Sequence, residues 1–241
     1  MRLDKALSSS GYGTRSEVKT LIAKGLVSVS GNVIKDPGYK LKDDEAKMIE
    51  VKGQSADIKE NIYLVLNKPD GVLTAMEDKR LPHVGEFIPP NLKNRKISPV
   101  GRLDFHTTGL LILTNDGELS HRLTSPNYDI PKVYEVTYDG PPVTDEQVRD
   151  AKDGVTLTDK DKPVKFKPSI LEPVNGSQAL LTLTEGKTHE VRRIFAKWER
   201  PVTALKRIKA GSLSLGDLNA GELRELTAEE ISGLKKITGL I

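Results

Sequence analysis

Apolar residues near the start of the chain recur at the spacing of two short helices. They fall every three or four positions over 3–7 and again over 18–22, and a Gly-Tyr-Gly run separates the two stretches. Thr14, with Glu17 three residues later, has the pattern of a capping box at the start of the second helix. Two short apolar runs around a Ser-Gly-Asn turn then predict a hairpin over 27–34.

A change of composition after residue 51 divides the chain. Residues 52–61 are polar and show no periodicity, which is typical of a linker. An apolar strand that ends in a Pro-Asp-Gly turn follows over 62–72. We therefore predict a small unit over 1–51, near the lower size limit for independent folding, a linker over 52–61 and a larger domain over 62–241.

The larger domain mixes strands with a few helices. Alternating apolar residues over 179–183 predict a strand, and apolar residues at helical spacing over 191–198 predict a helix. Capping boxes at 144–147 and 227–230 predict the starts of two more helices. Because strands outnumber helices and do not alternate regularly with them, the expected fold class is α+β: a small helix-rich module linked to a domain with a mixed, mainly antiparallel sheet.

The composition is that of an ordinary soluble protein, and it excludes several kinds of chemistry. Of 241 residues, 37% are apolar and 29% are charged, and no apolar run approaches the ~20 residues of a membrane span. The amino terminus lacks the apolar segment of a secretory signal, so we expect a cytoplasmic protein. The absence of cysteine excludes disulfides and thiolate nucleophiles. The chain has no Walker loop, dinucleotide motif or metal-ligand spacing, so we expect neither a cofactor nor a metal.

Positive charge is concentrated in two segments, although the net charge is only +3. Basic residues exceed acidic ones by four over 1–35 and by six over 187–211. Arg15 and Lys19 are spaced one helical turn apart, away from the apolar face of their predicted helix. Such clustering is expected of a protein that binds a phosphate backbone. The alternative is that both segments are simply solvated faces.

The carboxylate of Asp104 stands at an unusual place in the pattern. It follows a Gly-Arg-Leu run and precedes a hydroxylated stretch that continues into an apolar strand over 110–113, which a turn over 115–117 closes. Asp116 in that turn is interpreted as a turn residue. A loop that enters a buried strand can hold a functional side chain rigidly, but these residues alone favour a structural turn aspartate.

The motifs along residues 62–227 resemble, in order, those of pseudouridine synthases. They are LNKPDGV (66–72), GRLDFHTTGLLILTNDG (101–117), SHRLTSPN (120–127), PKVYEV (131–136), EGKTHEVRRIF (185–195) and ALKRIKAGSLSLGDLNAGELRELT (204–227). Within residues 1–51, the runs RLDKAL, TRSE and VSVSGNVI resemble the small RNA-binding module of a small-subunit ribosomal protein. The branch that modifies single uridines of ribosomal RNA is most similar, in particular the one acting on 16S RNA. Two positions depart from its pattern: Glu190, where glutamine is more common, and Ala210, where a larger aliphatic residue is.

This resemblance implies catalytic roles for Asp104, Tyr134 and Arg192 in converting a flipped-out uridine to pseudouridine. Asp104 would be the nucleophile, attacking the sugar or the base, and the Arg192 guanidinium would keep it ionised. Tyr134 would pack against the target base and assist proton transfer, and Arg102 would fill the gap left by the flipped nucleotide. The other expected RNA contacts are Arg2, Lys5, Arg15 and Lys19, together with Lys206 and Arg207 as phosphate contacts.

The expected partner is ribosomal RNA or a small-subunit assembly intermediate, and one active site fits in one chain, so a monomer suffices. Two other classes of protein remain open. One is a non-catalytic RNA-binding or ribosome-assembly factor with the same fold. The other is a carboxylate-dependent nucleoside hydrolase, which would release free uracil.

Overall fold

The chain divides into two units, each with its own hydrophobic core. The computed structural model describes residues 1–42, 44–56, 58, 61–159 and 162–241. The first unit holds residues 1–62 together with the segments 89–97 and 114–116. The second unit holds residues 63–88, 98–113 and 117–241.

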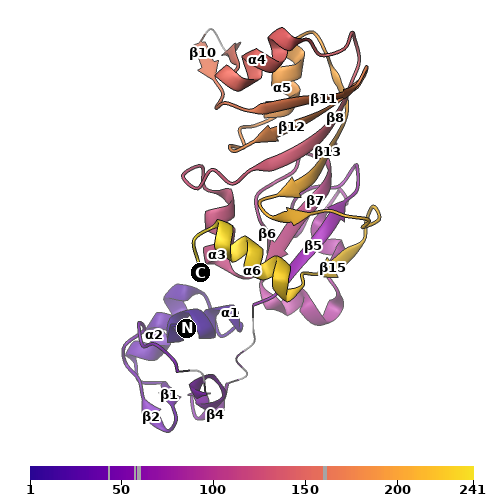
Figure 1. The fold of residues 1–241 in the computed structure, drawn as a ribbon. Helices are drawn as coiled ribbons and strands as arrows, with labels where there is room; N and C mark the ends of the chain where they lie inside the picture. Colours follow the sequence, from indigo (N-terminus) through magenta and orange to yellow (C-terminus); the bar gives the residue numbers. More distant parts are fainter. Residues whose placement is uncertain (43, 57, 59–60, 160–161) are drawn as a thin grey trace. The chain divides into compact units, whose positions relative to one another are not determined.

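Two short helices and, among the described residues, a four-stranded antiparallel sheet form the first unit (Figure 1). The helices are α1 (Leu3–Ser9) and α2 (Arg15–Ala23), and two 3-10 helices, η1 (Glu45–Met48) and η3 (Pro90–Arg95), accompany them. The strands lie in the order β2 (Asn32–Val33), β1 (Val27–Val29), β3 (Ile49–Val51) and β4 (Gln54–Ser55).

The predicted start of α2 is confirmed. The Thr14 hydroxyl accepts from the Glu17 amide at 3.3 Å, and the Glu17 carboxylate accepts from the Thr14 amide at 2.7 Å. These two bonds satisfy amides that a helix start leaves without partners. Val18 and Ile22 are fully buried, while Leu21 packs only partly against the core.

The predicted linker differs from the structure in its first half. Gln54 and Ser55 form β4, which pairs with β3, and Ala56 is buried in the core of the first unit. A two-residue polar edge strand is joined through its backbone alone, so its side chains give no periodicity to recognise. Residues 57, 59 and 60 of this segment lie outside the described residues.

In the described part of the chain, a nine-stranded mixed sheet organises the second unit. Its main path runs β11 (Ile170–Asn175), β12 (Gln178–Leu183), β8 (Lys132–Tyr138), β13 (Val202–Ala210), β7 (Thr108–Thr114), β5 (Tyr63–Lys68) and β15 (Leu223–Glu225). β14 (Leu213–Ser214) pairs with β13, and β6 (Ser98–Pro99) pairs with β7. The strand pairs with an assigned residue register are antiparallel, except β13 with β7, which is parallel. The expected mixed, mainly antiparallel α+β architecture is therefore confirmed.

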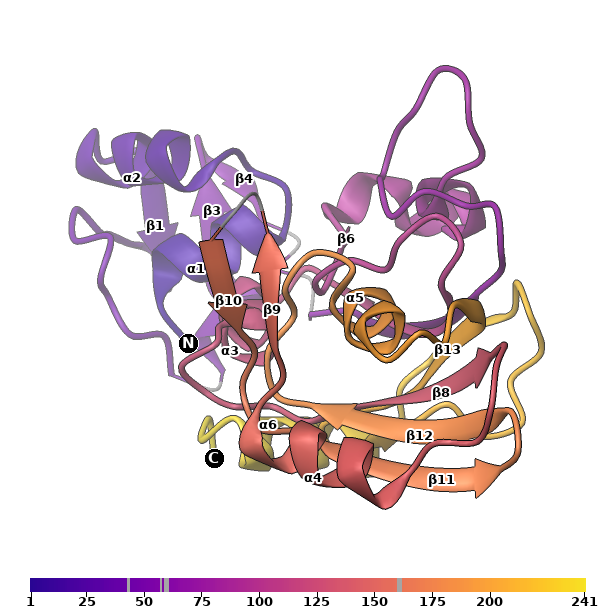
Figure 2. The ribbon, with the colours of Figure 1, turned by 90° about the horizontal axis from the view of Figure 1, so that it is seen from above.

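Four α-helices of the second unit border this sheet (Figures 1 and 2). They are α3 (Gly117–Thr124), α4 (Asp145–Asp153), α5 (Glu190–Lys197) and α6 (Ala228–Ile237), with the 3-10 helix η2 (Val84–Phe87) and a separate hairpin of β9 (Thr156–Asp159) and β10 (Lys162–Lys165). The predicted capping boxes at Thr144 and Thr227 open α4 and α6. No described helix has the length and apolar composition needed to cross a membrane.

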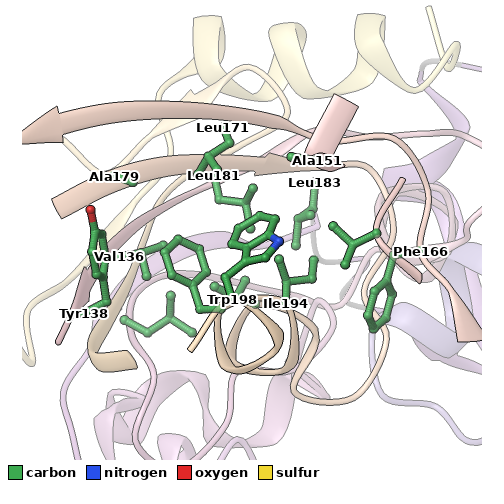
Figure 3. Close-up of a cluster of buried hydrophobic side chains, with 14 residues drawn as sticks. Val136, Tyr138, Ala151, Phe166, Leu171, Ala179, Leu181, Leu183, Ile194 and Trp198 are labelled. Carbon is green, nitrogen blue, oxygen red and sulfur yellow. The ribbon is translucent and has the colours of Figure 1, made fainter. Parts of the chain in front are cut away.

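Two hydrophobic clusters support the two ends of this sheet. In the first cluster, Trp198 and Ile194 from the α5 region pack with Leu181 and other buried side chains of β12 and β8 (Figure 3). The other cluster joins β5 and β7 to α3 and α6. Because the predicted apolar stripe over 191–198 faces the first cluster, α5 is fixed against the sheet with its other face free for function.

Candidate active site

Asp104 lies in the loop between β6 and β7, and its neighbours hold that loop in place. The Thr74 hydroxyl donates to the Leu103 carbonyl at 2.6 Å and accepts from the Leu103 amide at 3.1 Å. The Thr107 amide donates to the Asp104 carbonyl at 3.0 Å. Leu103 is buried, whereas the Asp104 side chain remains 39% exposed. The backbone is therefore anchored while the carboxylate is accessible.

Beneath this loop lies Lys68, a fully buried lysine to which the sequence analysis gave no role. Its Nζ donates to the carbonyls of Pro69, Val72 and Phe105 at 3.0, 2.8 and 3.2 Å. Burial lowers the pKa of Lys68 to about 8, against the opposing attraction of Asp70 and Asp104. The available signal was a charged residue at the end of an otherwise apolar strand.

The Asp104 carboxylate forms part of two cavities. The first, the Asp104 cavity, has a volume of about 400 Å³, and its walls include Arg102, Asp104, Tyr134, Leu183, Glu190 and Leu205. The second, the outer cleft, is more open, with a volume of about 870 Å³, and its walls include Asp70, Asp104, His106, His189, Arg192 and Thr203. The structure thus brings Asp104 together with Tyr134 in one cavity and with Arg192 in the other.

Arg192 contacts the Asp104 loop through its backbone and not through the expected ion pair. Its Nη1 donates to the Val202 carbonyl and its Nη2 to the His106 carbonyl, both at 3.0 Å. In the described part of the chain, the ion pair recorded for Asp104 is with His189, whose Nε2 lies 3.6 Å from Oδ1. Because two carbonyls occupy both ends of the guanidinium, Arg192 fixes the position of the loop, and His189 supplies the nearby group that can carry positive charge.

His189 is a second site residue that sequence reasoning missed. It precedes α5 with a left-handed backbone, at φ +52°. This conformation is uncommon outside glycine, and such residues often occur at functional sites. The signal was its place beside the basic motif.

Glu190 is a buried carboxyl group whose pKa is raised by its surroundings. It is 4% exposed, its Oε2 accepts from the Lys187 amide at 2.9 Å, and its Oε1 has no hydrogen-bond partner among the described residues. Burial, together with the nearby Glu185 carboxylate, raises the pKa of Glu190 to about 7. Burial also acts to raise the pKa of Glu185, but bonds from the Lys167 amide and the Lys187 ammonium hold it below its usual range. A neutral Glu190, like an amide, presents both a donor and an acceptor.

The residues expected to bind RNA in the first unit differ in their exposure and in the ion pairs that they form. Arg15 and Lys19 are exposed on α2, as their spacing predicts. Arg2 is exposed but forms an ion pair with Asp4 at 2.9 Å. Lys5 lies 3.5 Å from the carboxylate of Asp116.

Two residues are more buried than the sequence indicates. Asp116, interpreted as a simple turn residue, is 4% exposed and pairs with Lys5. Arg207 is also 4% exposed, and its Nε donates to the Leu110 carbonyl at 2.8 Å. Its burial corrects the expectation of a phosphate contact on the protein surface, because the hydrogen bond to β7 draws the guanidinium inside. Lys206, its neighbour on β13, is partly exposed, and Arg102 is exposed.

Comparisons with known proteins match the two parts of the chain separately. Residues 62–197 match the model of the RNA pseudouridylate synthase family, and residues 1–46 match that of the S4 domain. An Aquifex aeolicus (strain VF5) protein described as an uncharacterized RNA pseudouridine synthase is 42% identical, over 98% of this chain and 97% of its own. The ribosomal large subunit pseudouridine synthase B of Bacillus subtilis (strain 168) is 36% identical, over 98% and 96%. A crystal structure of a pseudouridylate synthase aligns with a TM-score of 0.68 at 34% identity, covering 97% of this chain and 99% of that one.

These matches describe a small RNA-binding module followed by the mixed-sheet domain of an enzyme that modifies RNA. The chain belongs to the RNA pseudouridine synthase family, whose members are isomerases.

Proposed function

We propose that this enzyme converts a uridine of ribosomal RNA to pseudouridine with Asp104 as the nucleophile. The observation that carries the proposal is the accessible Asp104 carboxylate, which forms one wall of a cavity of about 400 Å³ together with Tyr134. This cavity is of the size that small-molecule ligands occupy, and a flipped-out uridine needs such a pocket.

The reaction breaks the bond between N1 of uracil and C1′ of ribose and forms a bond between C5 and C1′. The proton on C5 is lost and N1 gains one, so atoms and charge balance without a cofactor. The carboxylate of Asp104 attacks either C1′ or the base, and both routes require it to be ionised. Arg192 holds its loop through the His106 carbonyl, and His189 stands 3.6 Å from the carboxylate.

Tyr134 and Glu190 complete the walls of the same cavity. Tyr134 lies on β8, with its ring partly packed against the first hydrophobic cluster, so it offers a fixed surface against which a base can stack. Its hydroxyl is the group we assign to proton transfer at the base. Arg102, exposed at the edge of the cavity, is assigned to the space left in the RNA by the flipped nucleotide.

The target RNA is the finer part of the proposal. The sequence resemblance favours 16S RNA, whereas the Bacillus subtilis relative is named for the large subunit. Transcripts of 16S and 23S RNA are therefore both incubated with the enzyme, and uridines that retain a carbodiimide adduct are mapped. We expect one modified position in one of the two transcripts.

The decisive variant is Asp104→Asn, with Asp70→Asn as its matched control. Asp70 lines the outer cleft and its carboxylate, 64% exposed, pairs with His106 at 3.1 Å, so its loss removes a nearby negative charge without removing the nucleophile. We expect Asp104→Asn to abolish pseudouridine formation and Asp70→Asn to retain it. Activity of Asp104→Asn equal to that of the wild type refutes the assignment, and release of free uracil identifies a hydrolase instead.

A further inference from the structure

A third cavity adjoins the Asp104 cavity, and the proposed chemistry places no ligand in it. Its volume is about 340 Å³. Arg102, Tyr134, Gly186 and Lys187 form part of the walls of both cavities, so Tyr134 lies at the boundary between them. We call this space the basic cavity because of the two cations described next.

Arg207 is one of these cations. It is 4% exposed, and its Nε donates to the Leu110 carbonyl at 2.8 Å. Within the described part of the chain, no partner is recorded for its two terminal nitrogens, although the residue lines the basic cavity. A guanidinium has five N–H donors, so Arg207 has donors to present to the cavity besides the one that Leu110 accepts. A ligand in the cavity that carries acceptor atoms can bind to them.

Lys132 is another cation in the wall of the basic cavity, which Arg102 and Lys187 also line. It is partly buried, and among the described residues its Nζ donates to one carbonyl, that of Ile130, at 3.1 Å, so two of its three donors have no acceptor there. Burial and the like charge of Arg207 lower the pKa of Lys132 to about 8. Two cations that repel one another therefore border one small space, as is expected where a ligand with acceptor atoms binds between them.

The remaining walls limit what that ligand can be. Apolar side chains make up a large part of them, namely Val100, Ile112, Leu123, Ile130 and Ala210. A phosphate group would lose its hydration against such a surface, whereas the face of a nucleobase gains from it. The Glu185 carboxylate also lines the cavity and would repel an anion. A flat ring with acceptors on one edge satisfies these conditions.

We propose that the basic cavity binds a guanine base of the RNA substrate, close to the target uridine. Guanine has two adjacent acceptors, O6 and N7, which arginine and lysine recognise, whereas adenine and cytosine place an amino donor beside their acceptor. Uracil has a single carbonyl at that edge. The N1–H and the amino group of guanine are donors, and the Glu185 carboxylate is the acceptor available to them.

This inference rests on the proposed function and adds a determinant of substrate choice to it. A guanine in the basic cavity and a uracil in the Asp104 cavity would lie on either side of Tyr134. The enzyme would then select a uridine whose RNA also places a guanosine in the basic cavity.

The test uses the full-length enzyme and short RNAs that contain the uridine mapped with the wild type. Each guanosine flanking the target is replaced, one at a time, by 7-deazaguanosine, which lacks the N7 acceptor and keeps the rest of the base. We expect one replacement to lower kcat/KM about fivefold or more, mainly through KM, as the loss of a base contact does. The other replacements are expected to leave kcat/KM unchanged.

The variant Lys132→Met links that effect to the basic cavity, and Lys209→Met, an exposed position on the same strand as Arg207, is its matched control. We expect Lys132→Met to have the same kcat/KM with the guanosine RNA and with the 7-deazaguanosine RNA. Lys209→Met is expected to keep the wild-type preference for the guanosine RNA. Because substitution of the buried Arg207 risks the fold, Arg207→Lys serves only as a second variant, with a reduced preference expected.

The proposal is overturned if no guanosine replacement alters kcat/KM, if the target has no flanking guanosine, or if Lys132→Met retains the full preference. A uniform loss of RNA affinity in Lys132→Met, with no dependence on the base analogue, identifies a phosphate contact and likewise overturns it. Failure of the wild type to form pseudouridine in unmodified RNA is a different result, because it refutes the proposed function.

Discussion

Replacing Lys68 by methionine tests whether a charged group is held without water beneath the Asp104 loop. The lysine is fully buried, and its Nζ contacts three backbone carbonyls, including that of Phe105, which directly follows Asp104. Methionine retains the length and apolar character of the chain but has no ammonium group. Lys68→Met therefore removes the charge and the three hydrogen bonds while leaving most of the packing.

The pKa of Lys68 gives the expected magnitude and its sign. Burial lowers it from 10.5 to about 8 in the folded protein. Between these values the unfolded chain binds more protons than the folded one, so the free energy of unfolding rises with pH across this window. At about 1.4 kcal/mol per pKa unit, the contribution of Lys68 increases by about 3 kcal/mol from pH 7 to above pH 10. The variant lacks this increase.

The measurement is urea unfolding of both proteins at several pH values, followed by the fluorescence of Trp198. This is the single tryptophan of the chain, and it is buried in the first hydrophobic cluster of the second unit. We expect the free energy of unfolding of the wild type, minus that of Lys68→Met, to increase by about 3 kcal/mol as the pH rises. The exposed Lys209→Met serves as control, with a constant difference expected. A Lys68→Met difference that is also independent of pH refutes the reasoning that burial controls this lysine.

Three further substitutions test the framework of the site and the RNA-binding module. Gly109→Ala is expected to cost several kcal/mol and to reduce soluble yield, because Gly109 has φ +101° and an added Cβ would collide with the Arg207 carbonyl; thermal unfolding measures this. Thr227→Ala removes a capping box from α6 and is expected to cost about 1 kcal/mol in the same assay. Joint replacement of Arg15 and Lys19 by glutamine is expected to make the slope of log K against log salt shallower by about one to two, and filter binding to ribosomal RNA that gives an unchanged slope contradicts their assignment.

The sequence predicted well those features that depend on residues close together in the chain. The capping boxes at Thr14, Thr144 and Thr227 are all formed, because each depends on side chains three residues apart. The strands predicted over 110–113 and 179–183 are present as β7 and β12, because a buried strand needs a matching apolar pattern. The mixed α+β fold followed from the same local patterns.

The burial of polar groups could not be predicted in this way, since it depends on partners far away in the chain. Arg207 is drawn inside by the carbonyl of Leu110, which lies 97 residues earlier. Lys68 uses a carbonyl of the Asp104 loop, 37 residues later. Arg192 was correctly expected near Asp104, but its choice of backbone carbonyls over the carboxylate depends on the path of two other segments.

The parallel junction of β13 with β7 has a consequence for how the enzyme becomes active. In this junction Lys206 lies opposite Thr108 and Arg207 opposite Gly109. It joins two halves of the sheet, each of which has its own hydrophobic cluster. Asp104 precedes β7 on one half, whereas Tyr134 belongs to the other. Either half formed alone does not bring Asp104 and Tyr134 into one cavity. With the roles proposed for these two residues, the appearance of activity during refolding reports the closing of this seam.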